Sequence, residues 1–152
     1  EFLASADKQR VLARELAPIL AHELRHAAQY RRSILSPGVL TGQAIEFEYE
    51  AYISGHDYIH EALKADRKAD ISGGDLYDYE SFLDGFDAYL QDVAGNAIYS
   101  ENKPLNAPFF NDLIASRRAG WAAHAAEGYR LLAERHPQMA KYYLQKAAAL
   151  EK

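Results

Sequence analysis

The sequence contains no cysteine. A disulfide framework and a thiolate zinc site are therefore both excluded, and any metal must be held by histidine, aspartate or glutamate. The search for a site narrows to the 6 histidines and the carboxylates. The absence of cysteine says little about the compartment, because cytosolic proteins and bacterial secreted proteins can both lack it.

Long apolar runs and excess positive charge are also missing. No run approaches the roughly 20 apolar residues that span a bilayer, and no charged-then-apolar signal pattern opens the chain. We therefore expect no membrane association and no signal peptide, in a domain that is cytoplasmic or secreted as part of a larger protein. Lysine and arginine number 17 against 22 acidic residues, a net charge of -5. This balance argues against nucleic acid as a partner.

Strand signals are nearly absent, because β-branched residues nowhere alternate convincingly with polar ones. We expect a mostly α, compact helical domain with little or no β-sheet. A length of 152 residues fits a single domain, residues 1–152. The start at Glu1 without a methionine is consistent with a segment excised from a longer chain.

Apolar residues at helical spacing predict five helices. Their approximate ranges are 6–32, 43–70, 77–93, 111–135 and a last one introduced by Pro137. Pro18 should either kink the first helix or begin a second one, and Gly55 could interrupt the helix over 43–70. Breakers predict a loop over 33–42, and prolines predict irregular structure over 99–110.

The first predicted helix contains the sequence HELRH over residues 22–26. His22 and His26, at i and i+4, lie on one helix face about one turn apart, so both imidazoles can reach one zinc ion. Glu23 projects about 100° around the helix from His22 and can act on a metal-bound water as a general base without ligating the metal. The motif therefore predicts metal ligands at His22 and His26 and a catalytic base at Glu23.

Residues 20–29, LAHELRHAAQ, resemble the active-site helix of zincin metallopeptidases, and HELRHAAQ looks especially like metallopeptidase-type domains of bacteria whose function is poorly characterised. In the gluzincin branch the third zinc ligand is a glutamate in an ExxA motif on a following helix. Glu48 to Ala51 match that motif, whereas Tyr52 stands where an acidic residue is usual. The resemblance implies Glu48 as third ligand and Zn²⁺ as cofactor. It covers about a third of the chain.

Helix geometry leaves a second choice for the third ligand. Residues two positions apart on a helix point about 200° apart, so Glu48 cannot share a face with Glu46 and Glu50. Glu46 and Glu50 do share one, at i and i+4. The runner-up arrangement has Glu46 as ligand and Glu50 as the hydrogen-bond partner of a zinc-bound histidine.

Further histidines and tyrosines offer other roles. His56 and His60 form a second i, i+4 pair that could bind another metal or replace Glu48. One of Tyr52, His56 or Tyr58 could hydrogen-bond the oxyanion that forms during hydrolysis. The sequence leaves the choice among these three open.

These patterns favour a zinc-dependent metallopeptidase-like domain that hydrolyses peptide bonds of a peptide or protein substrate with a metal-activated water. One feature points away from catalysis: zincins usually place a β-sheet before the motif helix, and its edge strand binds the peptide. The 21 residues before His22 read as helix instead. The alternative is a non-catalytic helical interaction or structural module in which HExxH is a structural metal site or a coincidence.

Overall fold

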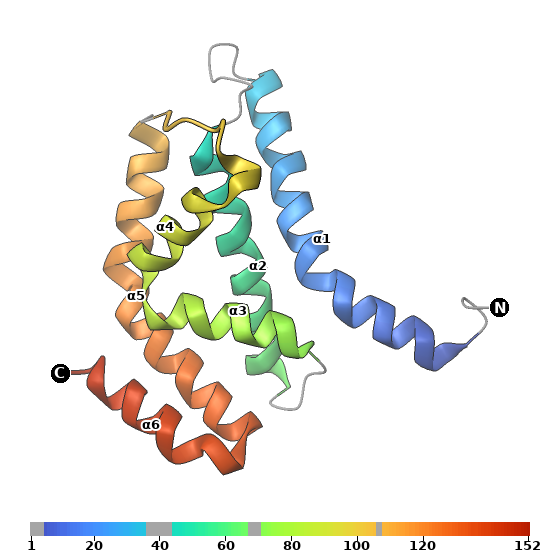
Figure 1. The fold of residues 1–152 in the computed structure, drawn as a ribbon, viewed down its shortest axis with the longest axis vertical. Coiled ribbons are helices and arrows are strands. Elements are labelled where there is room, and N and C mark those ends of the chain that lie inside the picture. The colour runs from blue at the N-terminus through green and yellow to red at the C-terminus, as the bar shows by residue number, and fades with distance from the viewer. Residues whose placement is uncertain (1–4, 36–43, 67–70, 106–107) are drawn as a thin grey trace.

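The computed structural model describes residues 5–35, 44–66, 71–105 and 108–152, and these fold into six α-helices (Figure 1). The helices are α1 (Ala6–Leu35), α2 (Ile45–Ala65), α3 (Gly73–Asp84), α4 (Phe86–Gly95), α5 (Pro108–Arg135) and α6 (Ala140–Ala149), with single 3₁₀ turns η2 (Ala97–Tyr99) and η3 (Pro137–Met139). Within these ranges the only β-type pairing is an isolated parallel bridge between Ala44 and Lys103. The expected mostly α fold is confirmed.

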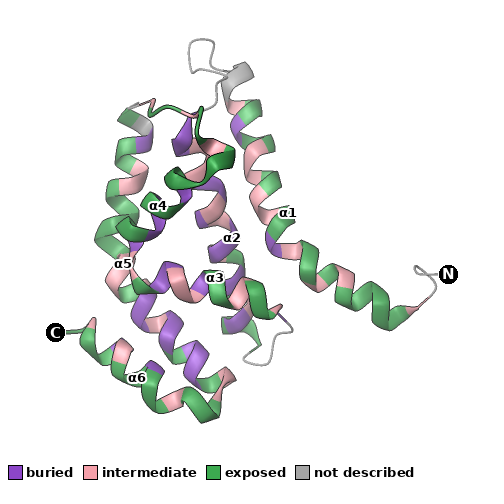
Figure 2. Cartoon of the chain, in the orientation of Figure 1, coloured by how far each residue is buried: buried purple, intermediate pink, exposed green. Residues whose placement is uncertain are grey.

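The hydrophobic core lies between α2, α3, α4 and α5, and α6 covers the end of α5. Figure 2 shows buried residues concentrated on α2 and on the half of α5 that packs against α6. The largest fully buried apolar or aromatic side chains are Tyr79, Tyr129, Phe110, Leu63, Leu83 and Leu132. Burial of such side chains is the main favourable term in folding.

α1 packs against α2 along one side and is otherwise open to solvent (Figure 1). Pro18 lies inside this continuous helix, and the helix axis turns in this part of the figure, as the kinked alternative predicted. The apolar residues that predicted the helix are largely exposed, because no second layer covers this face. They include Val11, Leu16, Ile19, Leu20 and Leu24.

The second helix is shorter than expected. It runs from Ile45 to Ala65 and passes through Gly55 without interruption, so the possible break there is wrong. It ends where the backbone of Asp66 becomes extended. Residues 43 and 67–70, which the prediction included, lie outside the described ranges.

The single helix expected over 77–93 is wrong, because two helices occupy this stretch. The backbone of Gly85 is extended and separates α3 from α4. α3 also begins earlier than expected, at Gly73, because the Ser72 hydroxyl accepts the backbone N–H of Asp75 and caps the helix. Periodicity alone does not detect a one-residue break between two helices that bury the same kind of face.

The remaining boundaries agree more closely with the predictions. α4 ends at Gly95, two residues after the predicted end, and Pro137 opens η3 directly before α6, as expected. α5 begins at Pro108, three residues before the predicted start, and ends at Arg135. Residues 33–35 of the predicted loop continue α1, and residues 36–42 lie outside the described ranges. No helix in the described ranges has the length and apolar character needed to cross a membrane.

Candidate metal centre

The contact between α1 and α2 brings three potential metal ligands to one point. His22 and His26 on α1 face Glu48 on α2, and one ligand atom of each lies within 4.8 Å of the other two. The two Nε2 atoms are 3.0 Å apart. Glu48 Oε2 lies 3.6 Å from His22 Nε2 and 3.4 Å from His26 Nε2. Among the described residues this is the only such group of three or more histidine or carboxylate side chains.

These separations can be compared with the needs of zinc. Two ligand atoms at 2.0 to 2.1 Å from one ion, in a tetrahedron, are about 3.3 Å apart. The separations from His22 to His26, from His22 to Glu48 and from His26 to Glu48 are 3.0, 3.6 and 3.4 Å. The three atoms therefore have the spacing of three tetrahedral ligands, which leaves a fourth position for water or substrate.

Gln29 determines which nitrogen of His26 is available to a metal. Its side-chain NH₂ donates to the Phe47 carbonyl oxygen at 3.0 Å and to Glu50 Oε2 at 2.7 Å. Both amide hydrogens are thus used, and Gln29 Oε1, 2.8 Å from His26 Nδ1, acts as the acceptor. His26 must carry a proton on Nδ1, so in the neutral ring the lone pair is on Nε2, the atom that faces His22 and Glu48.

A buried charge network holds Gln29 and joins the two helices. Glu50 on α2 is 2% exposed, and Arg25 Nη2 donates to its Oε1 at 2.6 Å. Arg32 adds a longer contact of 3.4 Å. A carboxylate buried this deeply is stabilised by a charged partner with good hydrogen-bond geometry. Arg25, inside HExxH, therefore pairs with a carboxylate of α2 and does not take part in the histidine group.

The runner-up third ligand is used elsewhere. Glu46 Oε2 accepts the backbone N–H of Leu105 at 2.9 Å and does not join the histidine group. Glu50 does support a histidine of the pair, but only through Gln29. The structure thus brings Glu48, and neither Glu46 nor Glu50, to His22 and His26.

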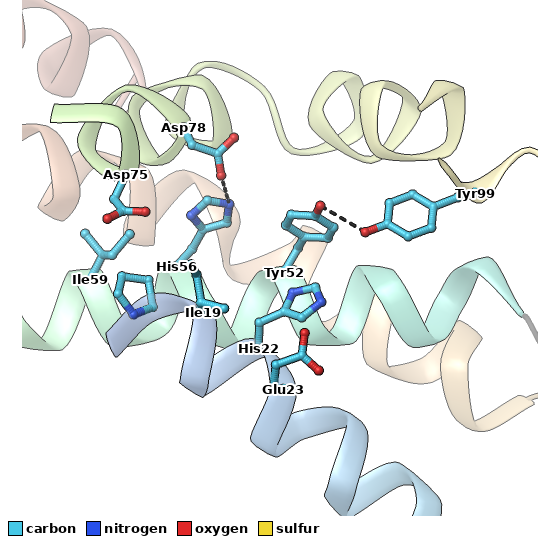
Figure 3. A pocket seen from close by; sticks show the side chains of 11 residues that line it. Ile19, His22, Glu23, Tyr52, His56, Ile59, Asp75, Asp78 and Tyr99 are labelled. Atoms are coloured by element: carbon cyan, nitrogen blue, oxygen red, sulfur yellow. Dashed lines mark hydrogen bonds and ion pairs between the residues drawn. The ribbon is translucent and has the colours of Figure 1, made fainter. Parts of the chain in front are cut away.

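A cavity of about 280 Å³ opens beside the histidine group (Figure 3). His22 and the exposed Glu23 of α1 lie on one side of it, and Tyr52 and His56 of α2 also line it. Tyr52 packs edge-on against His22, with ring centroids 4.7 Å apart, and its hydroxyl lies 3.1 Å from that of Tyr99. Glu23, next to His22 in the sequence, therefore borders a space that could hold a substrate.

Electrostatics favour a neutral His22. Burial, and then the proximity of His26, lower the pKa of His22, against the opposing effects of Glu48 and Glu23. A neutral imidazole is the form that binds zinc. Burial, followed by the hydrogen bond and the proximity of Tyr52 and the nearby Glu48, raises the pKa of Tyr99, so this hydroxyl stays protonated and can donate.

The second histidine pair does not converge. His56 Nε2 faces Asp78 at 3.4 Å, whereas His60 lies between Tyr79, at 2.6 Å from its Nδ1, and Glu127, at 3.3 Å from its Nε2. Neither histidine belongs to the group formed by His22, His26 and Glu48. Of the oxyanion candidates, Tyr52 and His56 line the cavity, whereas the exposed Tyr58 does not.

Sequence reasoning missed several residues around this centre. Gln29 could have been found, because it lies three positions after His26 and so shares its helix face. Asp75, Asp78 and Tyr99 also line the cavity. They come from α3 and η2, and no local pattern relates these segments to HExxH.

No protein-family model, curated protein or solved structure matches this chain. The likeness to zincins therefore rests on the motif residues themselves.

Proposed function

We propose that this chain is a zinc-dependent metallopeptidase-like domain. The observation that carries the proposal is the convergence of His22 Nε2, His26 Nε2 and Glu48 Oε2 within 4.8 Å, on a HExxH helix that borders a cavity. When bound, zinc supplies Lewis-acid chemistry: it lowers the pKa of a water molecule to about 7 and polarises a carbonyl group.

The chain's own residues have distinct parts in this proposal. His22, His26 and Glu48 hold the ion, and Gln29 fixes the ring of His26. Glu23 accepts the proton of the attacking water and returns it to the leaving amine, because it borders the same cavity as His22 and is not one of the three ligands. A peptide or protein segment would be the substrate.

A non-catalytic metal site is the second candidate, and one observation favours it. The described residues form no β-sheet, only the single bridge between Ala44 and Lys103, so they offer no edge strand on which a peptide could add. In that case the ion would fasten α1 to α2 and Glu23 would have no chemical role.

The two candidates are separated by one substitution. Glu23→Gln should keep the fold and the zinc but lower the rate of peptide cleavage by about 10² to 10⁴, because an amide cannot accept the proton of water. The substrate is a pool of mixed peptides, and mass spectrometry detects the products. Glu15→Gln, on the exposed part of α1, is the matched control. Cleavage that is equal in the wild type and in Glu23→Gln would contradict the mechanism.

A further inference from the structure

The cavity beside the histidine group ends in two carboxylates. Asp75 and Asp78 on α3 line it together with His56, and Figure 3 shows these three side chains gathered on the α3 side, across from His22 and Glu23 of α1. The remaining lining includes apolar groups. These are Pro18, Ile19 and Ile59.

Within the part of the chain that the structure describes, neither carboxylate contacts a lysine or arginine. Asp75 accepts the hydroxyl hydrogen of Ser72, and Asp78 accepts that of Tyr89 at 2.9 Å. Burial raises the pKa of Asp78, the hydrogen bond from Tyr89 lowers it, and the nearby charge of Asp75 raises it again. A cation placed in the cavity would relieve the repulsion between the two carboxylates.

His56 supplies an independent indication of a ligand. Its side chain is 3% exposed, and neither ring nitrogen makes a hydrogen bond, although Nε2 lies 3.4 Å from Asp78 Oδ2. Phe82 stacks on the ring, with centroids 4.6 Å apart, and Tyr89 meets it edge-on at 4.9 Å, so the ring is fixed. Burial lowers the pKa of His56 to about 3, which keeps the ring neutral. A neutral imidazole has one nitrogen that accepts a hydrogen bond, and a buried polar group without a partner calls for one.

We propose that this cavity is a substrate subsite for a lysine or arginine side chain next to the cleaved bond. Pro18, Ile19 and Ile59 contact the methylene stem, and the charged head group donates to Asp75, Asp78 and His56. A volume of about 280 Å³ far exceeds the roughly 30 Å³ share of one water molecule. That the subsite lies next to a cleaved bond rests on the proposed function. That the cavity binds a cation does not.

Two small probes test cation binding without catalysis. Nα-acetyl-lysine amide and Nα-acetyl-norleucine amide have side chains of similar length, but only the first carries a charge. The lysine probe should shift the backbone amide resonances of residues 75–78 in the nuclear magnetic resonance spectrum and should bind at least about tenfold more tightly than the norleucine probe, as expected for a charged hydrogen bond. Equal affinity for the two probes would overturn the proposal.

Substitutions of the two carboxylates test whether they bind the charged group of the lysine probe. Asp78→Asn should weaken binding of the lysine probe about tenfold and leave the norleucine probe unchanged, whereas Asp92→Asn, at an exposed position of α4, should change neither. Because Asp78 also accepts the Tyr89 hydroxyl, a thermal melt checks the fold, and Asp75→Asn serves as a second variant. Unchanged lysine affinity in both folded variants would overturn the proposal.

Cleavage patterns give a second readout. If the wild type cleaves the mixed peptide pool, lysine and arginine should be enriched on one side of the cleaved bond, and Asp78→Asn should remove the enrichment. Zinc-dependent cleavage without this enrichment would overturn the subsite alone. Selective binding of the lysine probe by a chain that retains no zinc would support the subsite and contradict the proposed function.

Discussion

Gln29 and His26 lie three positions apart on α1, and Gln29 Oε1 is 2.8 Å from His26 Nδ1. Through this contact the buried Glu50, which holds the amide of Gln29 at 2.7 Å, orients a candidate metal ligand that it does not touch. Outer hydrogen-bond partners of this kind fix the tautomer and the ring orientation of ligating histidines. The network therefore prepares His26 Nε2 for a metal.

The first prediction follows from this network. Gln29→Leu removes the acceptor for His26 Nδ1, so the affinity for zinc should fall about 10- to 100-fold. A competition titration with a chromogenic chelator measures the affinity, and Gln145→Leu, at an exposed position of α6, is the control. Equal zinc affinity in Gln29→Leu and the wild type would show that the hydrogen bond has no part in metal binding.

The second prediction concerns stability at low pH. Burial, and then the stacked ring of His60 at a centroid distance of 4.1 Å, lower the pKa of His124 to about 4. Asp57 and Glu127 oppose this shift, and Arg117 adds to it. The unfolded chain, with a histidine pKa near 6.5, binds more protons between pH 6.5 and 4. The free energy of unfolding should therefore fall as the pH is lowered through this window.

Denaturant titrations of the metal-free protein at several pH values measure this dependence. In His124→Phe the proton uptake on unfolding should decrease by up to about one proton over the window. It should not vanish, because the buried His56 has its own lowered pKa of about 3. His136→Phe, at a half-buried position before η3, controls for the loss of a histidine. An unchanged slope in His124→Phe would contradict the assignment.

The third prediction tests the packing of α5 against α3. A Cβ atom at Gly128 would lie 2.6 Å from the Tyr79 hydroxyl oxygen and 2.8 Å from Leu83 Cδ1. Both side chains are fully buried, and the Tyr79 hydroxyl is held 2.6 Å from His60 Nδ1, so they have little room to move. Gly128→Ala should lower the free energy of unfolding by about 1 to 3 kcal/mol.

Gly120 in the same helix is the matched control. A Cβ atom there would meet no atom within 4 Å. Gly120→Ala should therefore stabilise the protein by up to about 1 kcal/mol, since alanine is the better helix former. Denaturant unfolding of the two variants provides the comparison, and equal effects of both substitutions would contradict this packing.

The features that could be predicted from the sequence are those that depend on the spacing of residues within one helix. The i, i+4 relation of His22 and His26 is a property of any helix, and the predicted helix over 6–32 follows from the helical spacing of its apolar residues and from the absence of breakers other than Pro18. The choice of Glu48 over its neighbours required the resemblance to zincins. The structure gives a physical reason for the distinction: Glu46 is bonded to Leu105, and Glu50 to Arg25.

Other features depend on tertiary packing and were not predictable. The break at Gly85 lets α3 and α4 take different directions, and α3 packs against α2 with Asp78 beside His56. Tyr99 reaches Tyr52 from a position 47 residues later in the chain. No periodicity within one segment records such contacts, so the cavity next to the histidine pair could not be inferred from the motif alone.

The fourth prediction is the stoichiometry of zinc, which tests the central claim most directly. After loading with zinc near neutral pH and dialysis, elemental analysis should find about one zinc ion per chain, because three ligand atoms converge on one point. Glu48→Gln should bind zinc more weakly, and the His22→Ala, His26→Ala double variant should retain none. The account would be contradicted if the loaded wild type contained no zinc, or if the double variant contained as much zinc per chain as the wild type.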